Sequence, residues 1–226
     1  MILCDTELRT KCETINILGP DIGLVSPIEE DQIQPASIDV RLGEEFKYFN
    51  KYEVSSPNED IYFRALQNAD SYLLAKRRGY VKQAELYENL VIDPENFNAD
   101  KMMQSFTATK SNPFLLGPGD FALGHTLETI TLPNNLVGIV NGKSSLGRLG
   151  LIVHATAGFV DPGFPGQVTL ELYNLSPYAI ILRPGMKIAQ MVFQRCGSCE
   201  NPYGSDKLNS KYKGQTGATA SRISNG

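Results

Sequence analysis

The second half of the chain consists of short apolar runs that alternate with turn-forming residues at nearly regular spacing. Gly, Pro or Asn separates most neighbouring runs. Runs this short and this often interrupted favour strands over helices and indicate an all-β domain. We therefore expect a mainly β fold, a distorted β-barrel or jelly roll. The runs are 114–116, 121–123, 129–132, 136–140, 168–172, 180–182 and 188–193.

The first half predicts a short helix, a strand and an insertion. Residues 5–13 predict a short N-terminal helix, with Asp5 or Thr6 capping its first turn. Residues 37–42 alternate with period two, as a half-buried strand does. Residues 53 to about 110 carry a rough helical stripe and predict a partly helical insertion. The stripe is Leu66, Ala69, Leu73, Tyr80, Ala84 and Tyr87.

Length and composition favour one domain. With 226 residues, of which 42% are hydrophobic, the chain can bury one sizeable core. We expect a single domain over 1–226 that contains the insertion. Residues 197–226 are polar and small, which is typical of a mobile arm.

Charge and apolar patterning exclude several classes of partner. The formal net charge is -4, so the chain lacks the basic field of a nucleic-acid binder. No apolar run is long enough for a membrane span, and the start of the chain lacks the features of a signal peptide. The four cysteines are then expected to be reduced thiols in the cytoplasm.

The histidine and cysteine positions argue against a zinc enzyme. Zinc deaminases carry His-x-Glu followed by Pro-Cys-x-x-Cys. Neither His125 nor His154 has Glu two residues later, and Arg195 precedes the pair Cys196 and Cys199. We expect no zinc, and we interpret the two cysteines as thiols at the end of a strand.

The segment Lys143–Arg148, Lys-Ser-Ser-Leu-Gly-Arg, is the most informative stretch for chemistry. A lysine and an arginine bracket two hydroxyls, and together they can hold a polyphosphate. The alternative is a helical turn on the rim of the barrel, in which Ser144 or Ser145 caps exposed N–H groups. Spacing alone leaves both interpretations open.

Two further segments are candidates for a site. The segment Thr156–Phe164, which contains Asp161-Pro-Gly163, could form a tight turn that brings backbone close to a flat ligand, or it could be an ordinary β-turn in which Asp161 bonds its own loop. On the strand 168–172, Thr169 and Glu171 share one face and the apolar residues share the other. Partial burial of a carboxylate favours its protonated form, which suits a proton shuttle. The alternative is that Glu171 faces solvent on the polar side of the strand and has no catalytic role.

Taken together and in order, these motifs resemble those of the dCTP deaminases of the dUTPase-like superfamily. The likeness covers nearly the whole chain apart from the insertion. The matching segments are Gln34–Gly43, Lys143–Leu151, Asp161–Gly163, Thr169–Glu171, Arg183–Met186 and, in the tail, Pro202–Gly204, Ser210–Tyr212 and Gly214–Gln215.

The resemblance implies a fold, an assembly and a substrate. The fold would be of the dUTPase-like type, assembled as a homotrimer with active sites between subunits. The substrate would be dCTP with magnesium on its triphosphate, without zinc. The product dUTP would be bound as well, and dTTP is expected as an inhibitor that acts through the region of His154.

The resemblance also assigns roles to residues. Glu171 would be the general acid/base, while Ser144 and Arg148 would position water and substrate and stabilise developing charge. The arm, about 197–226, would close as a lid. The implied nucleotide contacts are Lys143, Ser144, Ser145, Arg148, Asp161, Thr169, Leu170, Glu171, Gln190, Tyr203, Lys211 and Gln215.

The product stays open between dUTP and dUMP. Gly158 and Phe159 resemble the bifunctional, dUMP-forming members, whereas monofunctional bacterial deaminases tend to have His-Arg there. This favours dUMP and diphosphate, which would supply thymidylate synthesis, with Asp161 or Glu171 also serving attack at the α-phosphate. The alternatives are a dUTP diphosphatase without deaminase activity and a catalytically silent nucleotide sensor. Against the diphosphatase, its typical Gly-Arg-Ser-Gly stretch is missing.

Overall fold

The computed structural model describes residues 1–16, 24–49, 70–74, 76–78, 91–156, 158–208 and 210–223. It divides the chain into two compact units. The first comprises Met1–Tyr48 and Ser105–Ala220, and the second comprises Phe49–Gln104 and Ser221–Gly226. The prediction of one domain with an insertion at 53–110 stays a prediction.

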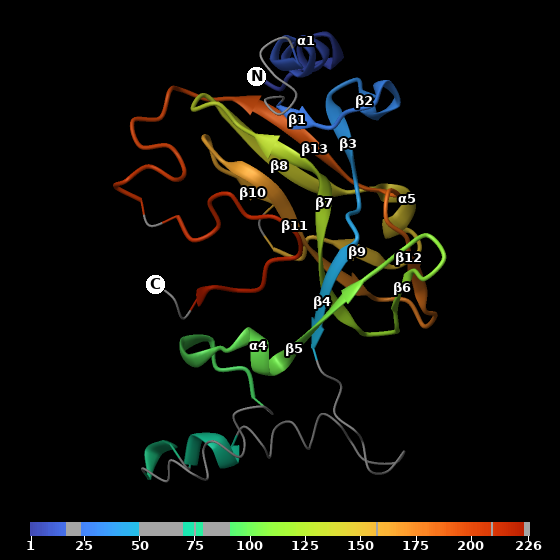
Figure 1. Cartoon of the computed structure of the whole chain (residues 1–226), viewed down its shortest axis with the longest axis vertical. Coiled ribbons are helices and arrows are strands. Elements are labelled where there is room, and N and C mark those ends of the chain that lie inside the picture. The colour runs from blue at the N-terminus through green and yellow to red at the C-terminus, as the bar shows by residue number, and fades with distance from the viewer. Residues whose placement is uncertain are drawn as a thin grey trace. The chain divides into compact units, whose positions relative to one another are not determined.

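Three sheets form the first unit (Figure 1). The largest has the order β5 (Met103–Thr107), β4 (Glu45–Phe49), β7 (Phe121–Thr131), β11 (Pro165–Asn174) and β9 (Leu151–Val153), and β1 (Val25–Ser26) also pairs with β7. The second has the order β10 (Phe159–Val160), β8 (Leu136–Gly142), β13 (Lys187–Arg195), β3 (Ser37–Arg41) and β2 (Ile33–Gln34). The third pairs β12 (Ile180–Leu182) with β6 (Phe114–Leu116).

One hydrophobic core joins the two large sheets. Strand β11 alternates strictly, with Val168, Leu170 and Leu172 buried in that core. An isolated bridge between Leu42 and Thr126 connects the sheets at one point. The expectation of a mainly β fold is confirmed. In the part of the chain that the structure describes, the hydrogen-bonded sheets do not close into a barrel. Of the two expected forms, the arrangement is therefore the jelly roll, in which separate sheets pack against each other.

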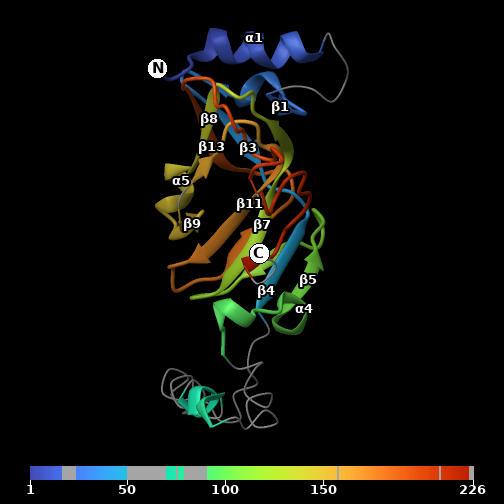
Figure 2. The ribbon, with the colours of Figure 1, turned by 90° about the vertical axis from the view of Figure 1, so that its left-hand side faces the viewer.

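Three local predictions can be compared with the structure. The predicted helix is α1 (Asp5–Asn16), which packs Leu8 and Cys12 into the core (Figure 2). The runs 121–123 and 129–132 are joined in one continuous strand, β7, which ends at Thr131, because most of the intervening residues are buried and the strand pairs with its neighbours along its length. Strand β3 is covered on both faces rather than half-buried, since its polar Asp39 is 3% exposed and ion-paired.

His125, which lies within β7, has a structural role. Its side chain is buried and accepts a hydrogen bond from the backbone of Glu45, while Nδ1 contacts the carbonyl oxygen of Thr126. The ring lies so close to Gly43 that a Cβ at this glycine would be 2.0 Å from it. The glycine that ends the Gln34–Gly43 motif therefore makes room for a core histidine.

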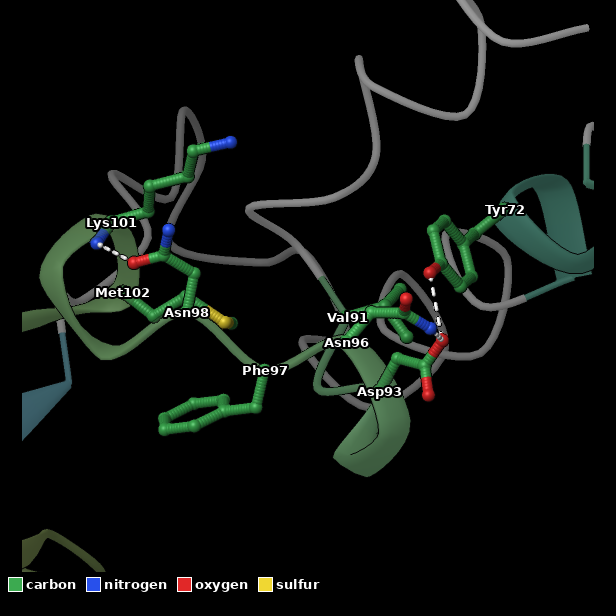
Figure 3. A pocket seen from close by; sticks show the side chains of 8 residues that line it. All are labelled: Tyr72, Val91, Asp93, Asn96, Phe97, Asn98, Lys101 and Met102. Atoms are coloured by element: carbon green, nitrogen blue, oxygen red, sulfur yellow. Dashed lines mark hydrogen bonds between the residues drawn. The ribbon is translucent and has the colours of Figure 1, made fainter. Parts of the chain in front are cut away.

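The second unit contains short elements around Asp93. Residues 70–74 are helical, followed by η2 (Pro94–Asn96) and α4 (Ala99–Met102). Asp93 accepts hydrogen bonds from Tyr72 (2.9 Å) and Asn96 (2.8 Å) beside a small pocket (Figure 3). It also accepts a hydrogen bond from Lys76 (2.7 Å). The hydrogen bond from Lys76 is the largest cause that holds the pKa of Asp93 well below its usual range, and it raises the pKa of Lys76.

The predicted helical stripe can be tested at one residue. Leu73 lies in a helical segment and is 48% exposed, so this unit does not bury it. Leu66, Ala69, Tyr80, Ala84 and Tyr87 lie outside the described residues. Among the helices that are described, none is long and apolar enough to cross a membrane.

Candidate active site

The segment Lys143–Arg148 forms a single helical turn that follows β8. In α5 (Ser144–Gly147), the carbonyl oxygen of Lys143 accepts hydrogen bonds from Leu146 and Gly147, both at 3.0 Å. The predicted helical turn is therefore present, but no side chain caps it. Ser144, Ser145 and Arg148 are exposed, which leaves two hydroxyls and a guanidinium on one turn accessible to a ligand.

Lys143 forms an ion pair with Asp39, a residue that the sequence analysis did not identify as a site candidate. Its Nζ lies 2.6 Å from Oδ1 of Asp39, which is buried on β3. Gln190 on β13 pairs with Asp39 on one side and with Asn141 on the other. The only sequence signal for Asp39 was a charged residue between two buried apolar positions in the Gln34–Gly43 motif.

Glu171 is half-buried on β11, and its carboxylate is held by Thr156. The backbone N–H of Thr156 donates to Oε2 (3.1 Å), and its hydroxyl lies 3.2 Å from the same oxygen. His154 donates its backbone N–H to the Glu171 carbonyl oxygen and has a positive φ of 75°. A non-glycine residue in this region is uncommon and clusters at functional sites. Thr156 is the first residue of the candidate segment Thr156–Phe164, but no sequence pattern predicts that it contacts Glu171.

Strand β11 presents Thr169 beside Glu171, as the alternation predicted. A bulge between Gln167 and Thr169 interrupts the pairing with β7, and Thr126 Oγ1 accepts the N–H of Val168 there (2.9 Å). Bulges of this kind re-aim side chains near active sites. Leu170, which lies between Thr169 and Glu171, is fully buried in the core of this chain.

The Asp161–Gly163 turn binds the beginning of the C-terminal arm. Gly163 has a φ of 86°, and a Cβ there would be 2.7 Å from Pro202, so the turn requires glycine. The backbone N–H of Tyr203 donates to Pro162 O (2.8 Å), and the Tyr203 ring packs against Phe164. Asp161 itself is exposed.

Residues 214–219 of the arm are hydrogen-bonded to β11, whereas composition indicated a mobile arm. Gln215 is buried and donates through Nε2 to the Gln167 carbonyl oxygen (2.7 Å), and Gln167 N–H donates back to Gln215 O (3.0 Å). Thr219 N–H reaches Thr169 Oγ1 at 3.4 Å. Lys211 is half-buried within the same stretch. The docked arm therefore brings Gln215 to the strand that carries Thr169 and Glu171.

The predicted site residues fall into two groups within one chain. The first lies around α5 and β13, and the second around β11, the Asp161–Gly163 turn and the arm. Figure 1 places α5 and the arm on opposite sides of the sheets, and they remain apart in the turned view of Figure 2. Among the described residues, no hydrogen bond or ion pair joins Lys143–Arg148 to Glu171.

Gly158 and Phe159 lead into β10, next to β8. The Gly158 carbonyl oxygen accepts the N–H of Val140 at 2.6 Å, and a Cβ at Gly158 would be 2.2 Å from Val140 O. Phe159 is 59% exposed. Strand packing therefore demands glycine at the first position and leaves the second side chain accessible.

The described residues contain no group of three or more His, Cys, Asp or Glu side chains arranged to hold a metal ion. None of the four cysteines, all of them in the described part of the chain, forms a disulfide. Cys196 and Cys199 are anchored through their backbone N–H groups to Asn135 and Asn134, at the end of β13.

Known proteins with similar sequences cover almost the whole chain. A family model described as dCTP deaminase-like matches residues 2–196. Proteins named "dCTP deaminase, dUMP-forming" from Beutenbergia cavernae, Mycobacterium avium and Streptomyces avermitilis are each 40% identical over 98% of this chain. The alignments cover 94%, 95% and 95% of those proteins, respectively.

A solved structure supports the fold. The 2'-deoxycytidine 5'-triphosphate deaminase from Agrobacterium tumefaciens superposes with a TM-score of 0.54 at 18% identity. The match covers 87% of this chain and 48% of that chain, so this protein spans about half its length. At 18% identity, this structural similarity supports the fold alone. The family model, the relatives and the fold agree, and the chain belongs to the dCTP deaminase-like family.

Proposed function

We propose that this protein hydrolyses dCTP to dUTP and ammonia and continues to dUMP and diphosphate. The observation that carries the proposal is the half-buried Glu171 carboxylate held by Thr156, on a chain 40% identical to dUMP-forming dCTP deaminases. The enzyme would act in the cytoplasm and supply dUMP for thymidylate synthesis.

Glu171 acts as the general base and acid in the first reaction. It takes one proton from water, whose oxygen bonds to the ring carbon that carries the amino group, and passes this proton to the adjacent ring nitrogen N3. The same carboxylate then carries the remaining hydroxyl proton to the amino nitrogen, so that the C–N bond breaks, ammonia leaves and the carbonyl of dUTP forms. The two donors from Thr156 fix the orientation of the carboxylate before substrate arrives. Ser144 and Arg148 position the water and stabilise the developing charge.

The second reaction is attack of water on the α-phosphate, which releases diphosphate. Asp161 and Glu171 are the candidate bases for it. Asp161 suits this role because it is exposed on a turn whose backbone is fixed by Leu132 and by the arm. Gly158 and Phe159 would set the shape of the segment that precedes it.

The substrate is the magnesium complex of dCTP, with the metal on the triphosphate rather than on protein ligands. Cationic groups and hydroxyls would bind its oxygens. The contacts are proposed at Lys143, Ser144, Ser145, Arg148, Asp161, Thr169, Leu170, Gln190, Tyr203, Lys211 and Gln215. dTTP would act as an inhibitor through the region of His154, no zinc would be required, and the arm would close over the triphosphate as a lid.

A homotrimer would complete the site. The two groups of site residues lie apart in one chain, so a neighbouring subunit could bring one group to the other. Exposed apolar side chains beside α5 support such an assembly: Leu149 is 62% exposed and Leu175 is 64% exposed. These residues are adjacent, because Leu175 N–H donates to Gly150 O. Light scattering at low protein concentration should give three times the chain mass.

The reaction is tested by following ammonia and diphosphate separately, with Mg–dCTP or Mg–dUTP as substrate and the Glu171→Gln protein as a blank. Ammonia and diphosphate from dCTP support the proposal, and ammonia alone would restrict it to deamination. Diphosphate from dUTP without ammonia from dCTP would make the protein a dUTP diphosphatase. Binding without any product would make it a nucleotide sensor.

A further inference from the structure

Asp39 lies behind the proposed nucleotide site without being exposed to it. It is 3% exposed in the middle of β3, and its Oδ1 lies 2.6 Å from Nζ of Lys143. The Lys143 side chain is 24% exposed, so most of this contact is shielded from water. A charge-assisted hydrogen bond in such a place is stronger than one on the surface.

The backbone around Asp39 is fixed independently of Lys143. Its carbonyl oxygen accepts a hydrogen bond from Nε2 of Gln32 (2.7 Å), and Gln32 is itself fully buried. Gln32 also binds Glu128, which is paired with Arg41 two residues along β3. Asp39 is therefore held in place by its own contacts, and it can fix the position of the long Lys143 side chain.

The helical turn α5 needs contacts outside itself to hold its conformation. A helix of four residues cannot sustain itself, because nucleation of a single turn is unfavourable. Leu146 packs one side of the turn against the hydrophobic core. Lys143 directly precedes the first residue of the turn. Among the described residues, it is the one side chain of Lys143–Arg148 that forms an ion pair.

We propose that Asp39 is a positioning residue, which holds Lys143 and thereby fixes the turn that presents Ser144, Ser145 and Arg148 to the nucleotide. This inference rests on the proposed function. It also modifies the nucleotide contact proposed above for Lys143: the ammonium stays on Asp39, so Lys143 would meet the nucleotide through its backbone and not through its charge. The phosphate charge is then met by Arg148 and the arm.

The test is a double-mutant cycle of Asp39→Asn and Lys143→Met with Mg–dCTP. Each single variant should raise KM about tenfold, the scale of one charge-assisted hydrogen bond. The double variant should be no worse than either single one, because both break the same contact. If Lys143 were instead a direct phosphate ligand, Asp39→Asn would free it, and KM would stay unchanged or fall. That result would overturn the inference.

Asp31→Asn is the matched control. Asp31 forms an ion pair of the same length with Lys187 (2.6 Å), but its side chain is 70% exposed and it lies outside the proposed contacts. This variant should keep the wild-type KM. A fall in melting temperature for Asp39→Asn without a change in KM would show a merely structural role and would also overturn the inference.

A structure of the wild-type protein with a bound nucleotide gives an answer even if Asp39→Asn does not fold. Lys143 Nζ should remain on Asp39, and its departure to a phosphate oxygen would contradict the inference. The wild-type ammonia assay separates the two proposals. Without ammonia the proposed function fails, whereas ammonia from a protein with uncoupled Asp39 and Lys143 refutes only the positioning role.

Discussion

Thr156 donates hydrogen bonds to the Glu171 carboxylate from both its backbone N–H and its hydroxyl. The two residues belong to different elements, the loop after β9 and the strand β11, and the N–H of His154 joins the same strand to that loop. The position of the proposed proton carrier therefore depends on a loop that begins with a left-handed residue.

Replacement of Glu171 by Gln should abolish turnover while nucleotide binding is retained. The amide keeps the shape of the side chain but cannot accept and return a proton, so kcat should fall by about 100-fold or more. Ammonia release and nucleotide titration by calorimetry measure the two quantities. Glu200→Gln is the control, because Glu200 has an 86% exposed side chain on the arm. Normal turnover in Glu171→Gln would move the proton role to another residue.

Thr156→Val should reduce kcat and leave the fold intact. The variant loses the hydroxyl donor to Glu171 and keeps the backbone donor. One hydrogen bond contributes about 1 kcal/mol, so kcat should fall about fivefold. Thr156→Ser retains the hydroxyl and should be close to wild type. Equal rates for both variants would show that the backbone donor is sufficient.

Gly158→Ala should destabilise the first unit. The added Cβ would be 2.2 Å from Val140 O, so β10 and β8 must separate. Overpacking of this kind costs about 1–3 kcal/mol, or roughly 2–12 °C in melting temperature for a domain of this size. Gly197→Ala serves as the comparison, since nothing lies within 4 Å of its Cβ position. A melting temperature equal to that of Gly197→Ala would mean that the strands adjust freely.

The Asp93–Lys76 pair should make the second unit sensitive to both pH extremes. Since folding lowers the pKa of Asp93, its contribution is present above the unfolded value of 3.8 and is lost as pH falls below it. Since folding raises the pKa of Lys76, its contribution is present below 10.5 and is lost as pH rises beyond it. The pair is partly exposed, so high salt should weaken it.

Hydrogen exchange of residues 91–104 measures this effect by comparison of wild type with Asp93→Asn at matched pH, where intrinsic exchange rates cancel. The wild type should be better protected near neutral pH. The difference should shrink as pH falls below 3.8, because the Asp93 carboxyl takes up a proton in the unfolded form before it does so in the folded form. A difference that stays constant down to about pH 2, well below the reference value for Asp, would assign the protection to groups other than this carboxylate.

The sequence by itself determined the fold class and the family. Short apolar runs with turn residues between them have few alternatives to strands, and the alternation along 168–172 correctly predicted which side of β11 carries Thr169 and Glu171. The order of the motifs led to the family that the comparisons confirm. These features are local, since each depends on residues that are near one another in the chain.

The tertiary structure alone decided which groups hold the site. Asp39 and Lys143 are brought together by the pairing of β3 and β8 with β13, and no pattern of spacing encodes that contact. Thr156 reaches Glu171 because β9 pairs with β11. The arm has the composition of a free tail, yet Gln215 and Gly217 find backbone and side-chain partners on β11. A buried polar group can be satisfied by any complementary donor, so its partner is chosen by packing in three dimensions rather than by sequence.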